Sequence, residues 1–252
     1  MLHLIQTALK WEDPAANGTH FESYLDNLSD GVAVLPEMFS TGFSMDSETL
    51  AESMYGPTHT WMLKNAKQRN LTLCGSIIIH EHGRYLNRFL WVTPDEETRV
   101  YDKRHLFRMA GEHEHYSGGE SNLTVLDAAT RIRPQICYDL RFPVWSRNTD
   151  DAYDLLLFIA NWPAARREQW LALLKARAIE NLSYVVGLNR IGDDGNGVQY
   201  SGDSVVFGPE GETIVDLGNE DTVATFEPDL DRLRDYRERF PAHLDADHFS
   251  VT

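Results

Sequence analysis

Short apolar runs and apolar residues at helical spacing alternate along this chain, and this alternation predicts an α/β fold. Two helices are indicated by apolar residues that recur every three or four positions, namely Phe21, Tyr24, Leu25 and Leu28 in one and Leu171, Leu174, Ala178 and Leu182 in the other. Another helix is expected to begin with Thr58 as its N-cap and to end near Asn70. The expected strands span residues 2–8, 32–35, 71–79, 85–92, 99–101, 132–137, 155–160, 184–189, 203–207, 213–217 and 223–226.

The connections between these elements are mostly short. Residues 80–83 predict a hairpin turn, and residues 208–211 predict a turn between two later strands. A long, irregular, polar loop is expected at residues 104–119, and a short helix at residues 144–148. Helices interspersed with many strands in this way favour a sandwich of sheets covered by helices.

We expect a single domain that spans residues 1–252, because no low-complexity segment or Gly/Ser linker interrupts the chain. Two apolar runs, at residues 32–36 and 155–163, each end in a loop that contains proline. This similarity suggests two related halves with the functional site between them.

The charge balance narrows the classes of partner. The 252 residues include 23 basic and 39 acidic side chains, a formal net charge of −16, which argues against a nucleic acid or an anionic membrane as partner. No stretch approaches the roughly 20 apolar residues that a membrane span needs. Residues 1–6 lack the basic and apolar segments of a secretory signal, so none is expected.

The chain has two cysteines, Cys74 and Cys137, and both lie in apolar runs. Two cysteines in a chain of this size do not form a disulfide framework, so a reducing cytoplasm is the expected location.

Three apolar runs end at side chains with complementary chemistry. The run at residues 32–35 is followed by Pro36 and Glu37, the run at residues 99–101 by Asp102 and Lys103, and the run at residues 132–136 by Cys137. A thiol, a carboxylate and an amine can act as nucleophile, general base and oxyanion stabiliser. Their shared position at strand ends predicts a cysteine hydrolase.

Each of these residues also has a simpler interpretation. A cysteine with apolar neighbours is more often a small core residue than a nucleophile, and Cys74, which more strand follows, fits that description. Cys137 instead precedes a polar turn, where its sulfur can face a pocket and the backbone N–H of Tyr138 can supply half of an oxyanion hole. Glu37 and Lys103 are alternatively surface charges, although Pro36 stiffens the exit from the strand and would aim Glu37 as a general base requires.

Other motifs argue against several classes of protein. Residues 112–115, Glu-His-Glu-His, lack the His-Glu-x-x-His spacing and have no accompanying Cys-x-x-Cys, so we expect no metal and interpret the segment as a loop that shapes the pocket. The Gly-x-Ser-x-Gly elbow, the Walker A loop, the Rossmann glycine motif and the papain-type cysteine signature are missing.

Around the three strand ends the chain resembles the nitrilase (carbon-nitrogen hydrolase) superfamily, and the resemblance extends from end to end. The motifs are Leu-Pro-Glu-Met-Phe around Glu37, Tyr-Asp-Lys-Arg-His-Leu-Phe around Lys103 and Ile-Cys-Tyr-Asp-Leu-Arg-Phe-Pro around Cys137. The resemblance implies that these residues form the catalytic triad and that Glu112 is the superfamily's second glutamate. It also implies a four-layer αββα sandwich, a homodimer and no cofactor.

Within the superfamily the chain is most similar to bacterial omega-amidases (2-oxoglutaramate amidases). The implied reaction is release of ammonia from the terminal amide of a small 2-oxo-dicarboxylic acid monoamide, either 2-oxoglutaramate or 2-oxosuccinamate, through a thioester. Aliphatic amidase, nitrilase and N-carbamoyl amino acid hydrolase activities are alternatives. A non-catalytic metabolite-binding protein of the same fold is an alternative of another class, against which the intact triad argues.

Such a substrate carries a carboxylate, which requires a cation in the pocket. Arg108, Arg141 and Arg166 are candidates by their positions in loops, although for Arg141 we favour an ion pair with Asp139 that braces the turn after Cys137. The candidate pocket walls are the aromatic residues Phe39, Phe43, Tyr116 and Trp162.

Overall fold

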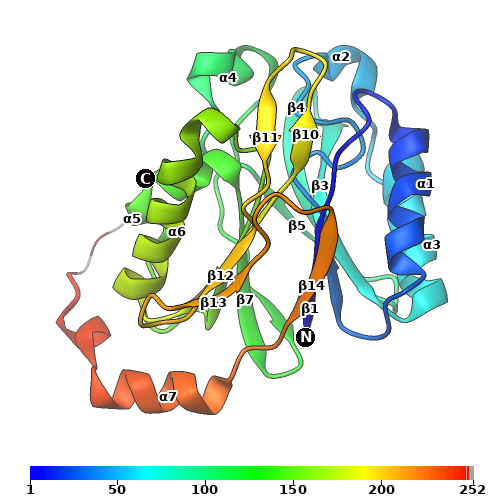
Figure 1. Cartoon of the computed structure of the whole chain (residues 1–252). Helices are drawn as coiled ribbons and strands as arrows, with labels where there is room; N and C mark the ends of the chain where they lie inside the picture. Colours follow the sequence, from blue (N-terminus) through cyan, green and yellow to red (C-terminus); the bar gives the residue numbers. More distant parts are fainter. Residues whose placement is uncertain (248, 250–252) are drawn as a thin grey trace.

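The computed structural model describes residues 1–247 and 249 and has two six-stranded sheets packed face to face. Helices pack on the outer face of each sheet, so the layers run helix, sheet, sheet, helix (Figure 1). The predicted αββα sandwich is therefore confirmed. None of the helices in the described residues has the length and apolar composition that crossing a membrane requires.

The first sheet has the order β14-β1-β2-β3-β4-β5. Its strands are β1 (Leu2–Gln6), β2 (Val32–Val34), β3 (Thr72–Glu81), β4 (Arg84–Val92), β5 (Thr98–Asp102) and β14 (Thr222–Phe226). Helices α1 (Pro14–Leu25) and α3 (Pro57–Arg69) cover its outer face through Phe21, Leu25 and Met62. The short helix α2 (Ser47–Leu50) precedes α3.

The second sheet has the matching order β13-β12-β9-β8-β7-β6. Its strands are β6 (Val125–Asp127), β7 (Thr130–Ile136), β8 (Leu155–Ala160), β9 (Tyr184–Asn189), β12 (Val205–Phe207) and β13 (Thr213–Asp216). Helix α6 (Arg167–Asn181) packs Trp170, Leu174 and Ala178 on its outer face, and the short helix α5 (Pro143–Ser146) lies nearby. Strands β10 (Ile191–Asp193) and β11 (Gln199–Ser201) form a separate hairpin.

The strand directions bring the three predicted strand ends to one region. Strands β1, β2 and β3 are parallel, and β5 runs in the same direction as β3 because two antiparallel pairings separate them. The carboxyl ends of β2 and β5 therefore lie at the same edge of the first sheet. In the second sheet β7, β8 and β9 are parallel and likewise share one edge for their carboxyl ends.

A continuous apolar core fills the space between the sheets. It includes Leu4 and Val34 from the first sheet and Ile136, Leu157 and Val186 from the second, all fully buried. Strand β14 returns from the second half of the chain and pairs antiparallel with β1, so each half of the sequence contributes to the first sheet.

The structure corrects the expected start of helix α3. The N-cap of α3 is Gly56 and not Thr58, and Pro57 occupies the first helical position. Proline favours that position because its φ is already helical and the N–H it lacks would have no partner there. The helix ends at Arg69, and Asn70 adopts the left-handed conformation as its C-cap.

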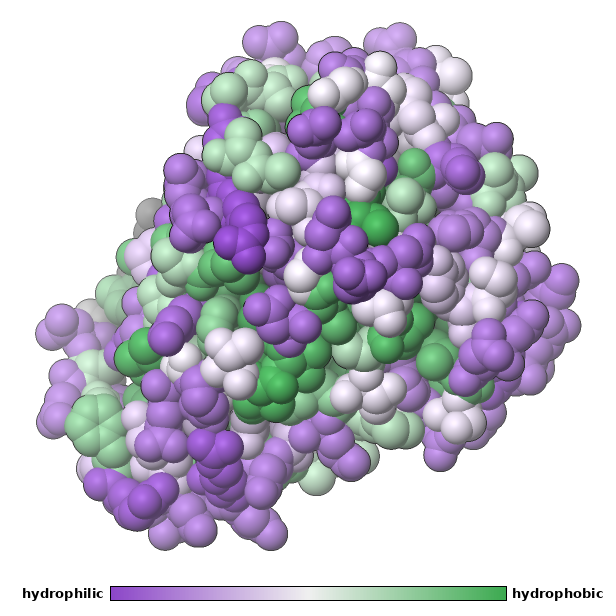
Figure 2. Space-filling model, in the orientation of Figure 1, coloured by the Kyte–Doolittle hydropathy of each residue, from purple (hydrophilic) through white to green (hydrophobic). Residues whose placement is uncertain are grey.

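Several short elements and one helix were not predicted. The helix is α7 (Leu230–Arg239), whose described buried residues are only Leu233 and Arg237, so its apolar stripe is too thin to recognise. Figure 2 shows that hydrophilic side chains cover α7 at the lower left of the molecule. On the same face, hydrophobic side chains gather near the middle, where the edges of the two sheets meet.

Candidate active site

Four polar side chains from four strand ends meet between the sheets. Glu37 follows β2 after two residues, while Lys103 directly follows β5. Cys137 directly follows β7, and Asn161 directly follows β8. The structure thus brings together the three residues that the sequence singled out and adds an asparagine that it did not.

Glu37, Lys103 and Glu112 form a fully buried charged cluster. The Lys103 Nζ donates to Glu37 Oε1 at 2.9 Å and to Glu112 Oε1 and Oε2 at 2.8 and 3.0 Å. All three side chains are sealed from solvent. Glu112 reaches this cluster from α4 (Glu112–His115), which lies in the loop that the sequence predicted to be irregular.

The Glu37 carboxylate is held on both oxygens. Its Oε1 accepts the Asn87 Nδ2–H at 2.8 Å in addition to Lys103, and its Oε2 accepts the Asn161 backbone N–H at 2.8 Å. The turn that carries it is also fixed, because Met38, at a φ of +45°, donates its N–H to Ser76 Oγ at 2.8 Å. Such fixed geometry is what a general base requires.

Cys137 lies at a strained bend of the backbone. It begins the 3₁₀ helix η2 (Cys137–Arg141) with a φ of +44°, a backbone conformation that residues other than glycine rarely adopt. Its Sγ is within weak hydrogen-bonding distance of the Asn161 carbonyl oxygen, at 3.9 Å. Because the first N–H groups of a helix lack internal acceptors, the N–H of Tyr138 is suited to bind an oxyanion.

The electrostatics of the site keep the thiol neutral and the amine charged. Burial raises the pKa of the Cys137 thiol well above its usual range, and the negative charge of Glu37 raises it further, while Lys103 opposes the change. Burial alone would lower the pKa of Lys103, but Glu112 and Glu37 outweigh it and raise that pKa. Glu112 has a raised pKa because burial disfavours its charged form, although Lys103 opposes the rise. A thiol in this state needs a base before it can attack.

Asp139 joins the Cys137 turn to the Lys103 segment. Its carboxylate accepts the Ile136 N–H at 3.0 Å, the Tyr101 hydroxyl at 2.7 Å and the His105 backbone N–H at 3.0 Å.

The expected ion pair between Arg141 and Asp139 is wrong. The Arg141 guanidinium lies over the Trp162 ring, 5.1 Å from its centroid, and donates to Gln169, because Asp139 points inward and Arg141 outward.

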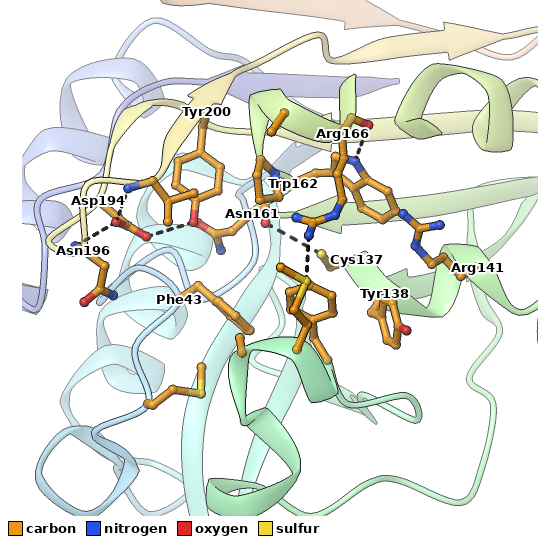
Figure 3. A pocket seen from close by; sticks show the side chains of 17 residues that line it. Phe43, Cys137, Tyr138, Arg141, Asn161, Trp162, Arg166, Asp194, Asn196 and Tyr200 are labelled. Atoms are coloured by element: carbon orange, nitrogen blue, oxygen red, sulfur yellow. Dashed lines mark hydrogen bonds between the residues drawn. The ribbon is translucent and has the colours of Figure 1, made fainter. Parts of the chain in front are cut away.

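Beside Cys137 is a cavity of about 450 Å³ (Figure 3). Of the predicted pocket residues, Phe43, Trp162 and Arg166 line it, as do Arg141 and Tyr138, the predicted oxyanion donor. The Phe43 ring also lies 5.1 Å from the Lys103 Nζ.

Three other predicted pocket residues lie elsewhere. Phe39 belongs to the core beneath the first sheet and packs edge-on against Phe21. Tyr116 is buried and donates its hydroxyl to the Ser44 carbonyl oxygen at 2.7 Å. Arg108, in the 3₁₀ turn η1 (Arg108–Ala110), is exposed and does not line the cavity.

Some residues of the site were missed from the sequence. Asn87 and Asn161 hold Glu37, but asparagines in strands and loops give no distinguishing signal. The β10–β11 hairpin adds a polar wall, in which the Tyr200 hydroxyl donates to Asp194 Oδ2 at 3.0 Å. Asp194 and Tyr200 belong to no recognisable sequence motif, so the sequence did not indicate them as residues of the site.

The described residues contain no group of three or more His, Cys, Asp and Glu side chains placed to hold a metal ion. His113 and His115, in α4, come from the segment that the sequence already interpreted as a loop shaping the pocket.

Comparisons with known proteins agree with this architecture. The profile of the carbon-nitrogen hydrolase family matches residues 4–238. The omega-amidase YafV of Escherichia coli (strain K12) is 48% identical over 252 residues, which cover 98% of this chain and 97% of that protein. A 2-oxoglutaramate amidase of Bacillus subtilis (strain 168) is 30% identical over 250 residues, covering 96% and 95%.

Among solved structures, XC1258 from Xanthomonas campestris superposes with a TM-score of 0.96 at 42% identity and covers 100% of this chain and 98% of that one. It is described as a CN-hydrolase superfamily protein with an arsenic adduct in the active site. Nit3 of Saccharomyces cerevisiae has a TM-score of 0.83 at 22% identity, covering 95% and 93%, and this likeness bears on the fold alone.

Proposed function

The chain belongs to the carbon-nitrogen hydrolase family, and from this premise we propose that it is an omega-amidase that acts through Cys137. The substrate is the terminal amide of a small 2-oxo-dicarboxylic acid monoamide, 2-oxoglutaramate or 2-oxosuccinamate, and the products are ammonia and the 2-oxo dicarboxylic acid. The full-length likeness to omega-amidase YafV and to a 2-oxoglutaramate amidase supports this choice of substrate.

The observation that carries the proposal is the position of Cys137 on the wall of a cavity of about 450 Å³, beside the fully buried Glu37 and Lys103. Burial raises the pKa of the Cys137 thiol, and the negative charge of Glu37 raises it further. A neutral thiol beside a fixed carboxylate is the arrangement that base-assisted nucleophilic attack requires.

In the first half of the reaction, Glu37 accepts the proton of the Cys137 thiol as the sulfur attacks the amide carbon. A C–S bond forms, and the carbonyl electron pair moves to the oxygen. The Lys103 ammonium and the Tyr138 N–H stabilise this oxyanion, because Lys103 is fixed by Glu37 and Glu112 and Tyr138 is fixed in the first turn of η2. Glu37 then gives its proton to the amide nitrogen, the C–N bond breaks, ammonia leaves and a thioester remains.

In the second half, water attacks the thioester carbon and gives a proton to Glu37. The tetrahedral intermediate collapses, the C–S bond breaks, and the proton on Glu37 returns to the sulfur. The carboxylic acid is released and Cys137 is restored as a thiol. Glu37 thus takes up and gives back a proton twice in one turnover.

Glu112 has a supporting role in this scheme. Both of its oxygens accept from the Lys103 Nζ, and Oε2 also accepts the Phe107 backbone N–H. These contacts position the lysine rather than touch the reacting atoms, so Glu112 acts as a positioning residue.

We also infer a homodimer in a reducing cytoplasm. The two unpaired cysteines support the reducing location. Exposed apolar side chains on the outer helical layer, Val144 in α5 and Ile179 in α6, support association with another copy. Light scattering after gel filtration should give twice the mass of one chain, and a mass of one chain would contradict the dimer.

The test of the function is ammonia release from a panel of substrates. The panel contains 2-oxoglutaramate, 2-oxosuccinamate, glutamine, a simple aliphatic amide, a nitrile and an N-carbamoyl amino acid. A strong preference for the two 2-oxo acid amides is expected. Turnover of another compound alone would keep the family's chemistry and reject this substrate, and no turnover of any would favour a metabolite-binding protein.

A further inference from the structure

Arg166 lines the cavity and has no anionic partner among the described residues. Arg166 is the last residue of the 3₁₀ turn η3 (Ala164–Arg166), and its Nη2 donates to the Met109 Sδ at 2.8 Å. Its guanidinium lies over the Phe107 ring, 5.5 Å from the centroid. None of the ion pairs in the described residues includes Arg166, whereas the next residue, Arg167, pairs with Glu168 and Asp203. A thioether is a weak acceptor, so a carboxylate that enters the cavity would replace it.

The backbone of Arg166 is fixed relative to the reacting groups. The Trp162 indole N–H donates to the Arg166 carbonyl oxygen at 2.8 Å, and the Arg166 N–H donates to the Pro163 carbonyl oxygen at 2.9 Å. The same short segment begins with Asn161, whose N–H holds Glu37 and whose carbonyl faces the Cys137 sulfur. The segment 161–166 therefore sets the separation between the thiol and the guanidinium.

The other two candidate arginines are less suited to bind an anion here. Arg141 stacks on the Trp162 ring and donates to Gln169 in α6, and in Figure 3 it lies at the margin of the cavity. Arg108 is exposed and outside the lining. Figure 3 shows the Arg166 side chain extending into the cavity on the Cys137 side.

The opposite wall of the cavity carries one carboxylate, that of Asp194. Asp194 holds the end of the β10–β11 hairpin through the N–H groups of Asn196 and Val198, at 2.8 and 3.0 Å, and through the Tyr200 hydroxyl. A substrate carboxylate directed to this wall would meet a like charge, whereas one directed to Arg166 meets a cation. The cavity therefore orients a charged substrate.

Resting on the function proposed above, we propose that Arg166 is the residue that binds the substrate's carboxylate, in place of its contact with Met109, and so selects amides whose far end is anionic. A planar guanidinium forms two parallel hydrogen bonds with a carboxylate, which fixes direction as well as charge. The amide at the other end is then directed toward Cys137.

The test compares Arg166→Gln and Arg166→Lys with the control Arg108→Gln, which removes an arginine outside the cavity. For each variant, kcat and KM are measured with 2-oxoglutaramate, together with the inhibition constant of 2-oxoglutarate, the product. The uncharged amide pentanamide is measured beside them.

Arg166→Gln should lower kcat/KM for 2-oxoglutaramate on the order of 10- to 100-fold, mainly through KM, because a charge-assisted pair is lost. The inhibition constant of 2-oxoglutarate should rise by a similar factor, while any activity on pentanamide stays near the wild-type value. Arg166→Lys should recover part of the loss, since it keeps the charge without the planar fork. Arg108→Gln should behave as the wild type.

An unchanged KM and an unchanged inhibition constant in Arg166→Gln would overturn the assignment, as would equal losses with 2-oxoglutaramate and pentanamide, which indicate a structural role. These outcomes differ from failure of the proposed function, in which the wild type itself releases no ammonia from 2-oxoglutaramate.

Discussion

Glu37 is the residue on which both halves of the proposed reaction depend. Its two carboxylate oxygens accept from Lys103, Asn87 and Asn161, so its orientation is fixed before substrate enters.

Glu37→Gln should therefore stop acylation as well as turnover. The amide keeps the shape of the side chain but cannot accept the proton of Cys137, so a loss on the order of 10²–10⁴ in rate is expected. Intact-mass spectrometry after rapid mixing with 2-oxoglutaramate should show unmodified protein. If the variant instead gained the mass of substrate minus ammonia at the wild-type rate, Glu37 would not be the base for acylation.

Lys103 has two functions, and one substitution tests both by separate measurements. Lys103→Met preserves the length of the side chain and removes the ammonium, so turnover should fall on the order of 10²–10³ through loss of an oxyanion donor. The same change leaves the buried Glu37 and Glu112 without their cation and should lower the free energy of unfolding by about 3–5 kcal/mol. Activity is measured below the melting temperature of the variant, and activity within about threefold of the wild type would place Lys103 outside the oxyanion site.

At the scale of single residues, the sequence was most informative where chemistry and strand ends coincide. Glu37, Lys103 and Cys137 each follow an apolar run, and this position made them candidates before any resemblance was considered. Phe39 was misplaced because a turn separates it from Glu37 and directs its ring into the core. Asn161 was given no role from the sequence, because its backbone N–H and its side-chain amide contact Glu37 across 124 positions of the chain, and no local pattern reveals such a contact.

At the scale of elements, helix α7 is attached to the second sheet mainly through a buried cluster of charges. Arg237 donates to the carbonyl oxygens of Leu182 and Tyr153, both at 2.9 Å, and to Asp154 Oδ1 at 3.2 Å. Asp154 also accepts the Nε–H of Arg131 at 2.9 Å. Burial alone would raise the pKa of Asp154, but Arg131 and Arg237 outweigh it and lower that pKa.

Asp154→Asn should lower the free energy of unfolding at neutral pH by about 1–3 kcal/mol, because charge-assisted hydrogen bonds to both arginines are weakened. A carboxylate whose pKa is lower in the folded state stabilises the fold above its unfolded pKa of about 3.9, and this contribution disappears as pH falls through the folded value. Urea unfolding from pH 7 down to pH 3 should therefore show the difference between variant and wild type shrinking below about pH 4.

The matched control for this series is Asp95→Asn, which makes the same chemical change at an exposed position. Its free energy of unfolding should follow that of the wild type across the pH range. A difference for Asp154→Asn that is constant with pH, or that grows in acid, would contradict the role given to the Asp154 charge.

The strands themselves were largely predictable, and the hairpin at the cavity was not. Runs such as residues 155–160 and 184–189 are continuously apolar because both faces of a parallel strand in this sandwich are covered. The β10–β11 hairpin is short and polar, so nothing in its pattern distinguishes it from a loop. Helix α7 was missed for the related reason that an arginine, and not an apolar stripe, anchors it.

At the scale of the whole molecule, the two halves of the chain build sheets of matching order and close the site between them. Alternating apolar runs and helical stripes indicated helix-covered sheets, and the resemblance to the superfamily supplied the four layers. The pairing of β14 with β1 could not be predicted, because nothing local to residues 222–226 specifies a partner more than two hundred residues away. The cavity depends on this assembly, since its lining comes from segments spread from Phe43 to Tyr200.

The most direct test of the whole account compares the two cysteines. Cys74 is fully buried in the core between the sheets, whereas Cys137 is partly buried and lies at the strained turn beside the cavity. Ammonia release from 2-oxoglutaramate is measured for the wild type, Cys137→Ala and Cys74→Ala, with the fold of each checked by circular dichroism. We expect turnover by the wild type and by Cys74→Ala, and no ammonia release above the buffer rate by folded Cys137→Ala. Turnover by Cys137→Ala near the wild-type rate would contradict the role of Cys137 as the nucleophile.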